Sequence, residues 1–275
     1  MSTSKTAEPS ARKHVEGPDP DSQAFSSVRA IYFDLDDTLC GYWDACKEGI
    51  RRTFEKHGPK HIPVEESIQH WAAAFREFSP TLKKTGWYET YLKNGEPTRT
   101  EQMRLTLQRM GIDDQDLARD LSQTYLEERD RCLELFPHAE TVLKNLYGRY
   151  PLGLITNGPA DIQRMEIATL NIEKYFQHIF IEGEQGEGKP LASVFERAAR
   201  AVGLTPDQLL FVGNSFAHDM APAIQFGWRT IWVRRESDVP PSAGPEAAKP
   251  EEPPKGATMP DAIIHDLDEL LRLLP

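Results

Sequence analysis

The run Val28-Arg29-Ala30-Ile31-Tyr32-Phe33-Asp34-Leu35-Asp36-Asp37-Thr38 decides the fold of this chain. Its apolar part is typical of a buried strand in a parallel sheet, which we predict over residues 30–34. Ligands of open α/β sheets bind outside the carboxyl ends of the strands, so Asp34 and Asp36 emerge where chemistry is expected. Residues i and i+2 of an extended segment share a face, and both carboxylates therefore point the same way.

Two carboxylates aimed at one place repel each other unless a cation lies between them or one of them is protonated. Asp34 and Asp36 therefore indicate either a metal site or a pair made of an acid and a nucleophile. An aspartate after a strand is also common as a turn or helix N-cap residue, and that plainer interpretation stays open for an isolated motif. The rest of the chain has to decide between the two.

The composition is that of an ordinary soluble protein, with 275 residues, 39% hydrophobic and 27% charged. A formal net charge of −11 without a basic stripe argues against a general nucleic-acid binder. Cys40, Cys46 and Cys132 form no CxxC or Cys/His motif, which predicts reduced thiols and a cytoplasmic protein. No apolar run is long enough for a membrane span and no secretory signal is visible. We expect a monomer or homodimer.

Residues 1–26 are polar and proline-containing, which predicts a disordered tail. Residues 42–135 show helical periodicity and no convincing strand, so we predict a helix bundle inserted after the first strand. Thr98 with Glu101 predicts a capping box for its third helix. Four apolar stripes carry the prediction: Trp43, Cys46, Ile50 and Phe54; Ile68, Trp71, Phe75 and Phe78; Met103, Leu107 and Met110; and Leu117, Leu121, Tyr125 and Cys132.

From residue 136 onward, strand and helix patterns alternate, which is typical of βαβ units and a parallel sheet. We predict strands over 152–156, 179–182, 209–212, 230–233 and 262–264, and helices over 161–170, 193–202, 218–226 and 266–274. Thr205-Pro206-Asp207-Gln208 predicts a capping box. Residues 236–260 are rich in Pro, Ala and Glu and predict a flexible loop. The fold class is α/β, with a Rossmann-like core of residues 27–41 and 136–275 around the helical insertion.

Two strand ends after the insertion carry polar residues suited to an anion. Thr156-Asn157-Gly158 offers a hydroxyl, an amide and a flexible turn. The same residues are also typical of a helix N-cap followed by a turn, and that interpretation stays open. Lys189, before Pro190, offers a fixed positive charge for a phosphoryl group, although a lone lysine in a loop is usually only solvated.

A third strand end, Gly213-Asn214-Ser215, is followed by Asp219 near a predicted helix start. A carboxylate there is favoured by the helix dipole and suits a hard cation such as Mg²⁺. No set of His and Cys residues suits Zn²⁺. Each of these signals is modest alone, but four polar strand ends in succession are hard to explain by turn chemistry.

These four motifs, with the helical insertion after the first, resemble the haloacid dehalogenase superfamily, in its phosphatase branch with an α-helical cap. The resemblance covers the first strand and everything after about residue 136. It implies that Asp34 is the nucleophile, Asp36 the general acid and base, and Lys189 the group that neutralises charge.

The resemblance also implies that Thr38, Thr156, Asn157 and Gly158 bind the phosphoryl group together with Lys189. Asp34, the backbone carbonyl of Asp36, and Asp219 would hold Mg²⁺, with Asn214 beside them. The expected partner is a small phosphorylated metabolite, with no nucleic acid or membrane.

The chain departs from the superfamily pattern at two places. The fourth motif usually begins with an acidic residue, and Asn214 keeps an oxygen ligand but removes one negative charge. Leu191-Ala192 follow Lys189-Pro190 where many members carry Asp-Pro. The favoured function is a Mg²⁺-dependent phosphatase acting through an aspartyl-phosphate. A phosphomutase, a dehalogenase and a non-catalytic binder of phosphate ligands stay open as alternatives.

Overall fold

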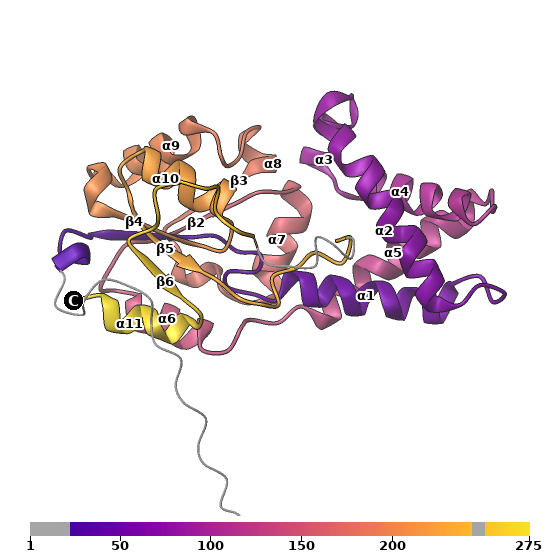
Figure 1. Ribbon diagram of the computed structural model, residues 1–275, viewed down its shortest axis with the longest axis horizontal. Helices are drawn as coiled ribbons and strands as arrows, with labels where there is room; N and C mark the ends of the chain where they lie inside the picture. Colours follow the sequence, from indigo (N-terminus) through magenta and orange to yellow (C-terminus); the bar gives the residue numbers. More distant parts are fainter. Residues whose placement is uncertain (1–22, 244–250) are drawn as a thin grey trace, which may run out of the picture.

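A six-stranded parallel sheet, in the order β3-β2-β1-β4-β5-β6, forms the centre of the computed structural model (Figure 1). The structure describes residues 23–243 and 251–275. The strands are β1 (Ala30–Phe33), β2 (Leu152–Thr156), β3 (His178–Ile181), β4 (Leu209–Gly213), β5 (Arg229–Val233) and β6 (Ala262–Ile264). The predicted α/β fold with a parallel sheet is therefore confirmed, and β1 lies between β2 and β4 at its centre.

Both faces of the sheet are covered by helices, because successive side chains of a strand alternate between faces. Ile31 and Phe33 face a cluster that includes α6 (Ala139–Leu146), α7 (Ala160–Thr169) and the C-terminal turn and helix. Ala30 and Tyr32 face a second cluster with α9 (Ala192–Val202) and α10 (Ala221–Gln225). All four residues of β1 are fully buried, so the residues that follow β1 leave the sheet from a rigid position.

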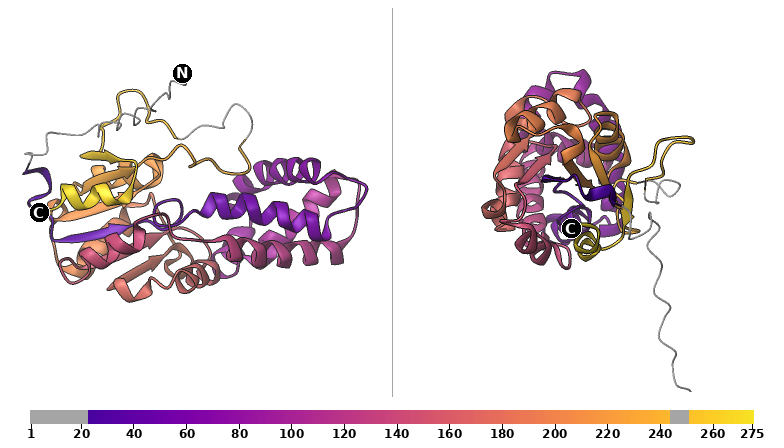
Figure 2. Two further views of the ribbon diagram at one scale, coloured as in Figure 1. Left: turned by 90° about the horizontal axis from the view of Figure 1, so that it is seen from below. Right: turned by 90° about the vertical axis from the view of Figure 1, so that its left-hand side faces the viewer.

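Residues 42–132, called the helical unit below, pack around their own hydrophobic cluster. The unit contains α1 (Tyr42–His57), α2 (Val64–Phe78), the 3₁₀ segment η2 (Ser79–Lys84), α3 (Trp87–Lys93), α4 (Glu96–Arg109) and α5 (Gln115–Cys132). Ile50, Trp71, Met103 and Leu121, one from each predicted stripe, lie in that cluster. Figure 2 shows the sheet and the helical unit at opposite ends of the long axis. The predicted helical insertion is therefore present.

The two chain segments that join the helical unit to the sheet run side by side. Gly41 N–H donates to the carbonyl of Glu134 at 3.1 Å, and Phe136 N–H donates to that of Leu39 at 2.9 Å. A further contact lies away from these linkers. Tyr88 of α3 hydrogen bonds to Glu182 of α8 (Glu182–Gln185). The helical unit thus meets the sheet-containing part at more than the linkers.

The loop after β5 also reaches the helical unit. Arg76 of α2 donates to the carbonyl of Ser242 at 2.7 Å. Beyond residues 244–250, which lie outside the described residues, the Glu251 carboxylate accepts N–H groups of Phe216 at 2.7 Å and Ala217 at 3.0 Å. The predicted flexible loop is therefore fixed at both of its described ends.

Several predicted boundaries were wrong. Helix α4 begins at Glu96 with Gly95 at its N-cap, and Thr98 lies inside the helix and donates back to the Gly95 carbonyl at 3.0 Å. Within the predicted disordered tail, Gln23–Phe25 forms a 3₁₀ turn, because Phe25 is buried in the core at 3% exposure. The rest of that tail, residues 1–22, lies outside the described residues.

The predicted helix over 218–226 begins as a π-helical turn, Phe216–Met220, and continues as α10. The predicted terminal helix divides into η7 (Leu267–Glu269) and α11 (Leu270–Leu273), behind an N-cap at Asp266. The capping box at Thr205 is confirmed, on a 3₁₀ turn. In the described part of the chain, no helix is both long and apolar enough to cross a membrane.

Candidate active site at the carboxyl edge of the sheet

Three charged side chains meet directly beyond β1 and β4. The Nζ atom of Lys189 lies 2.6 Å from Oδ1 of Asp34 and 2.7 Å from Oδ1 of Asp219. All three side chains are at least nine-tenths buried. Burial raises the pKa of Asp34 to about 6, with Lys189 opposing and Asp219 adding to the rise. Burial opposes the charge of Lys189, but the carboxylates of Asp219 and Asp34 outweigh it and raise the lysine pKa above its ordinary value.

The turn after β4 aims Asp219 at this point. Ser215 N–H donates to Oδ2 of Asp219 at 3.0 Å. A Cβ atom on Gly213 would lie 2.4 Å from the same oxygen, so only glycine leaves room for the carboxylate. The predicted residues Asp34, Lys189 and Asp219, which are far apart in the sequence, are thus brought together.

Thr38 and Asn214 lie on the other side of Asp34. The Thr38 hydroxyl lies 3.1 Å from Oδ2 of Asp34 and 3.2 Å from Oδ1 of Asn214. The Asn214 amide donates through Nδ2 to Asp238 at 2.8 Å. Because Asp238 occupies the donor end of this amide, the oxygen end faces Thr38 and Asp34. Sequence analysis missed Asp238, and its only signal is that it follows the end of a core strand.

The residues around Asp34 supply oxygen ligands only. Among the described residues, no three His, Cys, Asp or Glu side chains are arranged to hold a metal. Asp34 and Asp219 supply two formal negative charges, and Asn214 Oδ1 supplies a neutral oxygen. Such a donor set fits a hard divalent cation such as Mg²⁺ and does not fit Zn²⁺.

Asp36 belongs to a hydrogen-bonded chain that ends at Thr156. Gln163 of α7 donates through Nε2 to Oδ2 of Asp36 at 3.0 Å, and its Oε1 accepts from the Thr156 hydroxyl at 2.6 Å. Burial, and then the charge of Asp34, raise the pKa of Asp36 to about 7. A carboxyl with that pKa can donate a proton at neutral pH and accept one later.

Gln163 was missed by sequence analysis, although it lies on the helix that follows the Thr156 strand end. The Thr156 hydroxyl is hydrogen bonded to Gln163, and its contact with a phosphoryl group stays a prediction.

A buried ion pair joins the two parts of the molecule behind Asp36. Arg129 of α5 lies 3.0 Å from Glu166 of α7, and both side chains are at most 4% exposed. Gln163 also donates to Glu166 at 2.8 Å. Burial, and then the charge of Asp36, raise the pKa of Glu166 well above its ordinary value, with Arg129 opposing. Arg129 thus connects the helical unit electrostatically to the acid side of the site.

Asn157 fixes the backbone of Lys189. Its Oδ1 accepts the Lys189 N–H at 2.8 Å, and its Nδ2 donates to the Lys189 carbonyl at 2.7 Å. The N–H of Gly158 donates to Glu182 at 3.0 Å. Both amide groups therefore have partners inside the protein, and direct contact of Asn157 or Gly158 with substrate stays a prediction.

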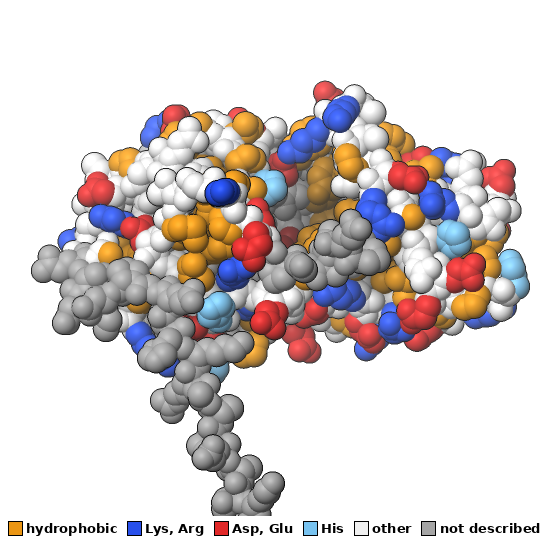
Figure 3. Space-filling model, in the orientation of Figure 1, with side chains coloured by type: hydrophobic (Ala, Val, Ile, Leu, Met, Phe, Trp, Pro, Cys, Tyr) orange, Lys and Arg blue, Asp and Glu red, His pale blue; other side chains and the backbone are white. Residues whose placement is uncertain are grey.

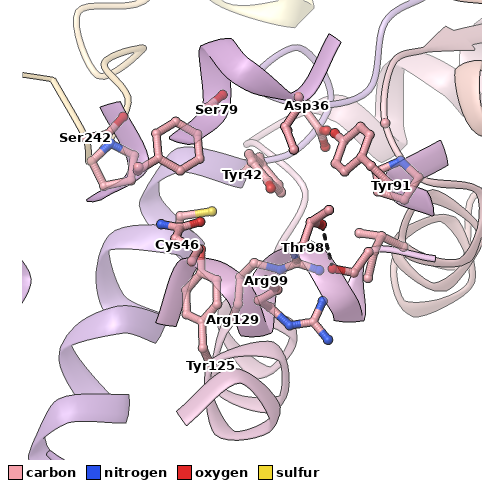
Figure 4. A pocket seen from close by; sticks show the side chains of 18 of the residues that line it. Asp36, Tyr42, Cys46, Ser79, Tyr91, Thr98, Arg99, Tyr125, Arg129 and Ser242 are labelled. Carbon is pink, nitrogen blue, oxygen red and sulfur yellow. Dashed lines mark hydrogen bonds between the residues drawn. The ribbon is translucent and has the colours of Figure 1, made fainter. Parts of the chain in front are cut away.

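A pocket of about 290 Å³ lies between the sheet edge and the helical unit. Figure 3 shows the surface hollowed between the two parts, with hydrophobic side chains in the hollow. Asp36, Asn157 and Gly158 line the pocket from the sheet side, together with Gln163. Most of its remaining wall comes from aromatic and polar residues of α1, α2, α4 and α5 (Figure 4). Ser242, from the loop after β5, closes part of the rim.

Known proteins resemble this chain in sequence and in structure. It is 30% identical over 211 residues to a phosphoserine phosphatase of Thermus thermophilus, covering 76% of this chain and 68% of that protein. It is 27% identical to an N-acylneuraminate-9-phosphatase of Rattus norvegicus, covering 80% and 88%. The magnesium-bound structure of the hydrolase YfnB from Bacillus subtilis superposes with a TM-score of 0.63 at 20% identity, covering 90% and 98%.

A dehalogenase structure is similar as well. The 2-haloacid dehalogenase of Pseudomonas syringae superposes with a TM-score of 0.57 at 26% identity, covering 90% of this chain and 97% of that one. The family model described as haloacid dehalogenase-like hydrolase matches residues 31–233, which include Asp34, Asp36, Lys189 and Asp219. The chain therefore belongs to the haloacid dehalogenase-like hydrolases.

Proposed function

We propose that this protein is a Mg²⁺-dependent phosphatase that hydrolyses small phosphate monoesters through a phosphoryl group carried on Asp34. One observation carries the proposal. Asp34 is held against the Lys189 ammonium at 2.6 Å, while Asp36, two residues on, has a pKa of about 7 and faces the pocket. A charged carboxylate beside a proton-donating one is the combination that phosphoryl transfer through an aspartate needs.

In the first step, an Asp34 carboxylate oxygen attacks phosphorus and the bond to the leaving oxygen breaks. Asp36 gives its proton to that oxygen, so the alcohol leaves neutral. In the second step, the Asp36 carboxylate takes a proton from water, which attacks the phosphorus. Inorganic phosphate leaves, Asp34 is restored as a carboxylate, and Asp36 is protonated again. Splitting the hydrolysis in this way replaces one difficult step by two easier ones.

The surrounding residues position these groups. Lys189 offsets the negative charge of Asp34 and of the incoming phosphoryl group, and Asn157 holds its backbone. Gln163 orients the Asp36 carboxyl through a 3.0 Å hydrogen bond. Asp34, Asp219 and Asn214, with the backbone carbonyl of Asp36, would hold Mg²⁺. When bound, the metal ion would supply positive charge against the phosphoryl oxygens.

The helical unit would act as the cap over this site. It is joined to the sheet-containing part by two adjacent linkers, which suits a rigid-body motion that opens for substrate and closes for chemistry. Closure would keep bulk water away from the first step.

Asp36 also favours a phosphatase over a dehalogenase. A halide leaves without a proton, whereas the alkoxide of a phosphate ester needs one, and Asp36 can supply it. The relatives in sequence that are named phosphatases agree with this choice. A non-catalytic role is disfavoured because Asp34, Asp36, Lys189 and Asp219 are all present and meet at one site.

A panel of phosphate esters and one haloacid, assayed with and without Mg²⁺, tests the proposal. Phosphate release that requires Mg²⁺ and is lost in Asp34→Asn is the expected result. Halide release without phosphatase activity would contradict it. Transfer of the phosphoryl group to a second sugar with no free phosphate would identify a phosphomutase instead.

A further inference from the structure

One guanidinium on the pocket wall has no acidic partner in the described part of the chain. Arg99 of α4 donates through Nε to the carbonyl of Ser122 at 3.1 Å. Within the described ranges of the chain, no Asp or Glu oxygen lies within 4.0 Å of Arg99. Its neighbour Arg129 differs, since it is paired with Asp130 at 2.9 Å and Glu166 at 3.0 Å. Burial and the repulsion of Arg129 lower the pKa of Arg99, and the opposing influence of Tyr125, Glu96 and Asp161 does not offset them.

Two more donors of the same pocket lack a hydrogen-bond partner among the residues that the structure describes. They are Nε1 of Trp71 and Nε2 of Gln102, which are buried, and both residues line the pocket. Trp71 is 3% exposed and Gln102 9%. A buried donor without an acceptor is unfavourable and rare in folded proteins. The unpaired groups on this wall are therefore a cation and two N–H donors, and each calls for an acceptor.

The rest of the pocket is mainly apolar. Tyr42 and Tyr125 line it with Arg99, and Asp36 lines it from the sheet side (Figure 4). Phe75 is a further aromatic lining residue. An occupant that fits has a carbon skeleton against the rings, a phosphoryl group toward Asp36, and an acceptor toward Arg99.

We propose that Arg99, Trp71 and Gln102 form a subsite for a carboxylate carried by the phosphate ester, so that the preferred substrates are phosphorylated carboxylic acids. The inference rests on the proposed function, because it assumes that the phosphoryl end of the ligand lies at Asp34. A carboxylate has planar oxygens that match the guanidinium fork, and it brings acceptors for the neighbouring donors. One guanidinium without an ion pair among the described residues matches one negative charge, and a pocket of about 290 Å³ suits a small acid.

The first arm of the test compares matched esters. The ratio of kcat/KM for 4-carboxyphenyl phosphate over phenyl phosphate is measured first, and the ratio for 3-phosphoglycerate over glycerol 3-phosphate is measured second. We expect both ratios to exceed about tenfold, as a charge-assisted hydrogen bond at a desolvated site provides. Ratios near one would overturn the subsite while leaving phosphatase activity in place.

The second arm uses variants. Arg99→Met should bring both ratios close to one, chiefly through KM. Arg104→Met is the matched control, because Arg104 lies on the same helix and is paired with Glu101, outside the pocket. It should keep the wild-type ratios. Trp71→Phe keeps the ring and removes only the N–H, so it should lower the ratios by a smaller factor. Unchanged ratios in both Arg99→Met and Trp71→Phe would overturn the proposal.

A binding measurement tests the carboxylate subsite independently of the proposed phosphatase function. Calorimetry of Asp34→Asn with 4-carboxyphenyl phosphate and with phenyl phosphate needs no turnover. A preference for the carboxylated ester that Arg99→Met removes in this background supports the subsite, even if no ester is hydrolysed. Equal affinities would overturn it, whatever the activity.

Discussion

The Nζ atom of Lys189 lies 2.6 Å from Oδ1 of Asp34 inside a site that is almost closed to solvent. Asp219 shares the same ammonium at 2.7 Å, so two carboxylates meet one cation. Removing a buried cation leaves uncompensated charges that are costly, whereas a second cation could offset the surplus negative charge. We therefore expect both the stability of the fold and any stabilisation by Mg²⁺ to depend on Lys189.

Replacing Lys189 tests this arrangement. Lys189→Met should lower the free energy of unfolding by about 3 kcal/mol or more, because Asp34 and Asp219 lose their buried partner. Mg²⁺ should restore part of that loss, since it binds the folded state between the same carboxylates. Urea unfolding with and without Mg²⁺ measures both effects. Lys144→Met, at an exposed pair with Glu140, is the control and should change little. Similar losses in the two variants would contradict the argument.

Replacing Asp34 tests the nucleophile. Asp34→Asn keeps the shape of the side chain and removes the attacking oxygen's charge, so kcat should fall about a thousandfold or more. No phosphoenzyme should be trapped by acid quench from a labelled ester. Circular dichroism checks that the variant is folded. Substantial turnover by a folded variant would remove Asp34 from the mechanism.

The loss of rate on replacing Asp36 should be greatest for esters with poor leaving groups. Asp36→Asn should reduce hydrolysis of an alkyl phosphate far more than phosphoenzyme formation from p-nitrophenyl phosphate, because the leaving group p-nitrophenolate needs no proton. Rapid-quench measurement of the first step compares the two esters. Equal losses would argue against proton transfer by Asp36.

The pH profile gives a second view of the same group. Burial and Asp34 raise the pKa of Asp36 to about 7, so its protonated form is present below that pH and lost above it. The rate of the first step with an alkyl ester should therefore fall as the pH rises through about 7. The same step with p-nitrophenyl phosphate should show no such fall, and a parallel decline for both esters would contradict the assignment.

Asp219 and Asn214 should differ in their importance for metal binding. Asp219→Ala removes a formal charge and should weaken Mg²⁺ binding much more than Asn214→Ala, which removes a neutral oxygen. Asn214→Asp should be tolerated and should tighten Mg²⁺. Calorimetric titration gives the affinities, and Asp207→Ala, on an exposed turn, serves as the control. Activity that is independent of Mg²⁺ would overturn this part of the account.

The sequence could predict those residues of the site that lie close to a recognisable strand end. Asp34 and Asp36 directly follow a buried strand, and Lys189, Asn214 and Asp219 follow other strand ends, so one sheet edge collects them all. Gln163 carries no such local mark, Asp238 lies further along the loop beyond β5, and Arg99 lies within the helical unit. They reach the site from a helix, from a loop and from the helical unit, and only the packing of distant segments brings them there.

The same reasoning explains the errors in secondary structure. Thr98 and Glu101 have the spacing of a capping box, but α4 begins at Glu96, where the Gly95 N–H is held by Asp161 of α7 at 3.1 Å. A tertiary contact therefore sets the helix start. Phe25 shows a second effect of tertiary packing. It lies in a polar segment but packs into the core, and this packing orders the neighbouring residues. Neither effect is visible in a local pattern.

Exchanging the helical unit tests its role as a cap. Residues of the helical unit form most of the pocket wall. The four proposed catalytic and metal-binding residues lie outside the helical unit: Asp34, Asp36, Lys189 and Asp219. Replacing the helical unit, residues 42–132, by the corresponding segment of a relative should therefore change the preferred ester and keep the expected dependence on Mg²⁺. The graft should retain an arginine at position 129, because Glu166 is fully buried beside Asp36 and would otherwise lose its cation.

Two measurements decide the outcome of that exchange. The first is the order of kcat/KM over a panel of esters, and the second is the Mg²⁺ concentration that gives half-maximal rate. A control graft with methionine at position 129 should unfold at lower temperature than the graft that keeps arginine. We argue that the helical unit sets the substrate preference and that the sheet edge carries out the chemistry. An unchanged order of esters, or a loss of Mg²⁺ dependence in a folded graft, would refute this argument.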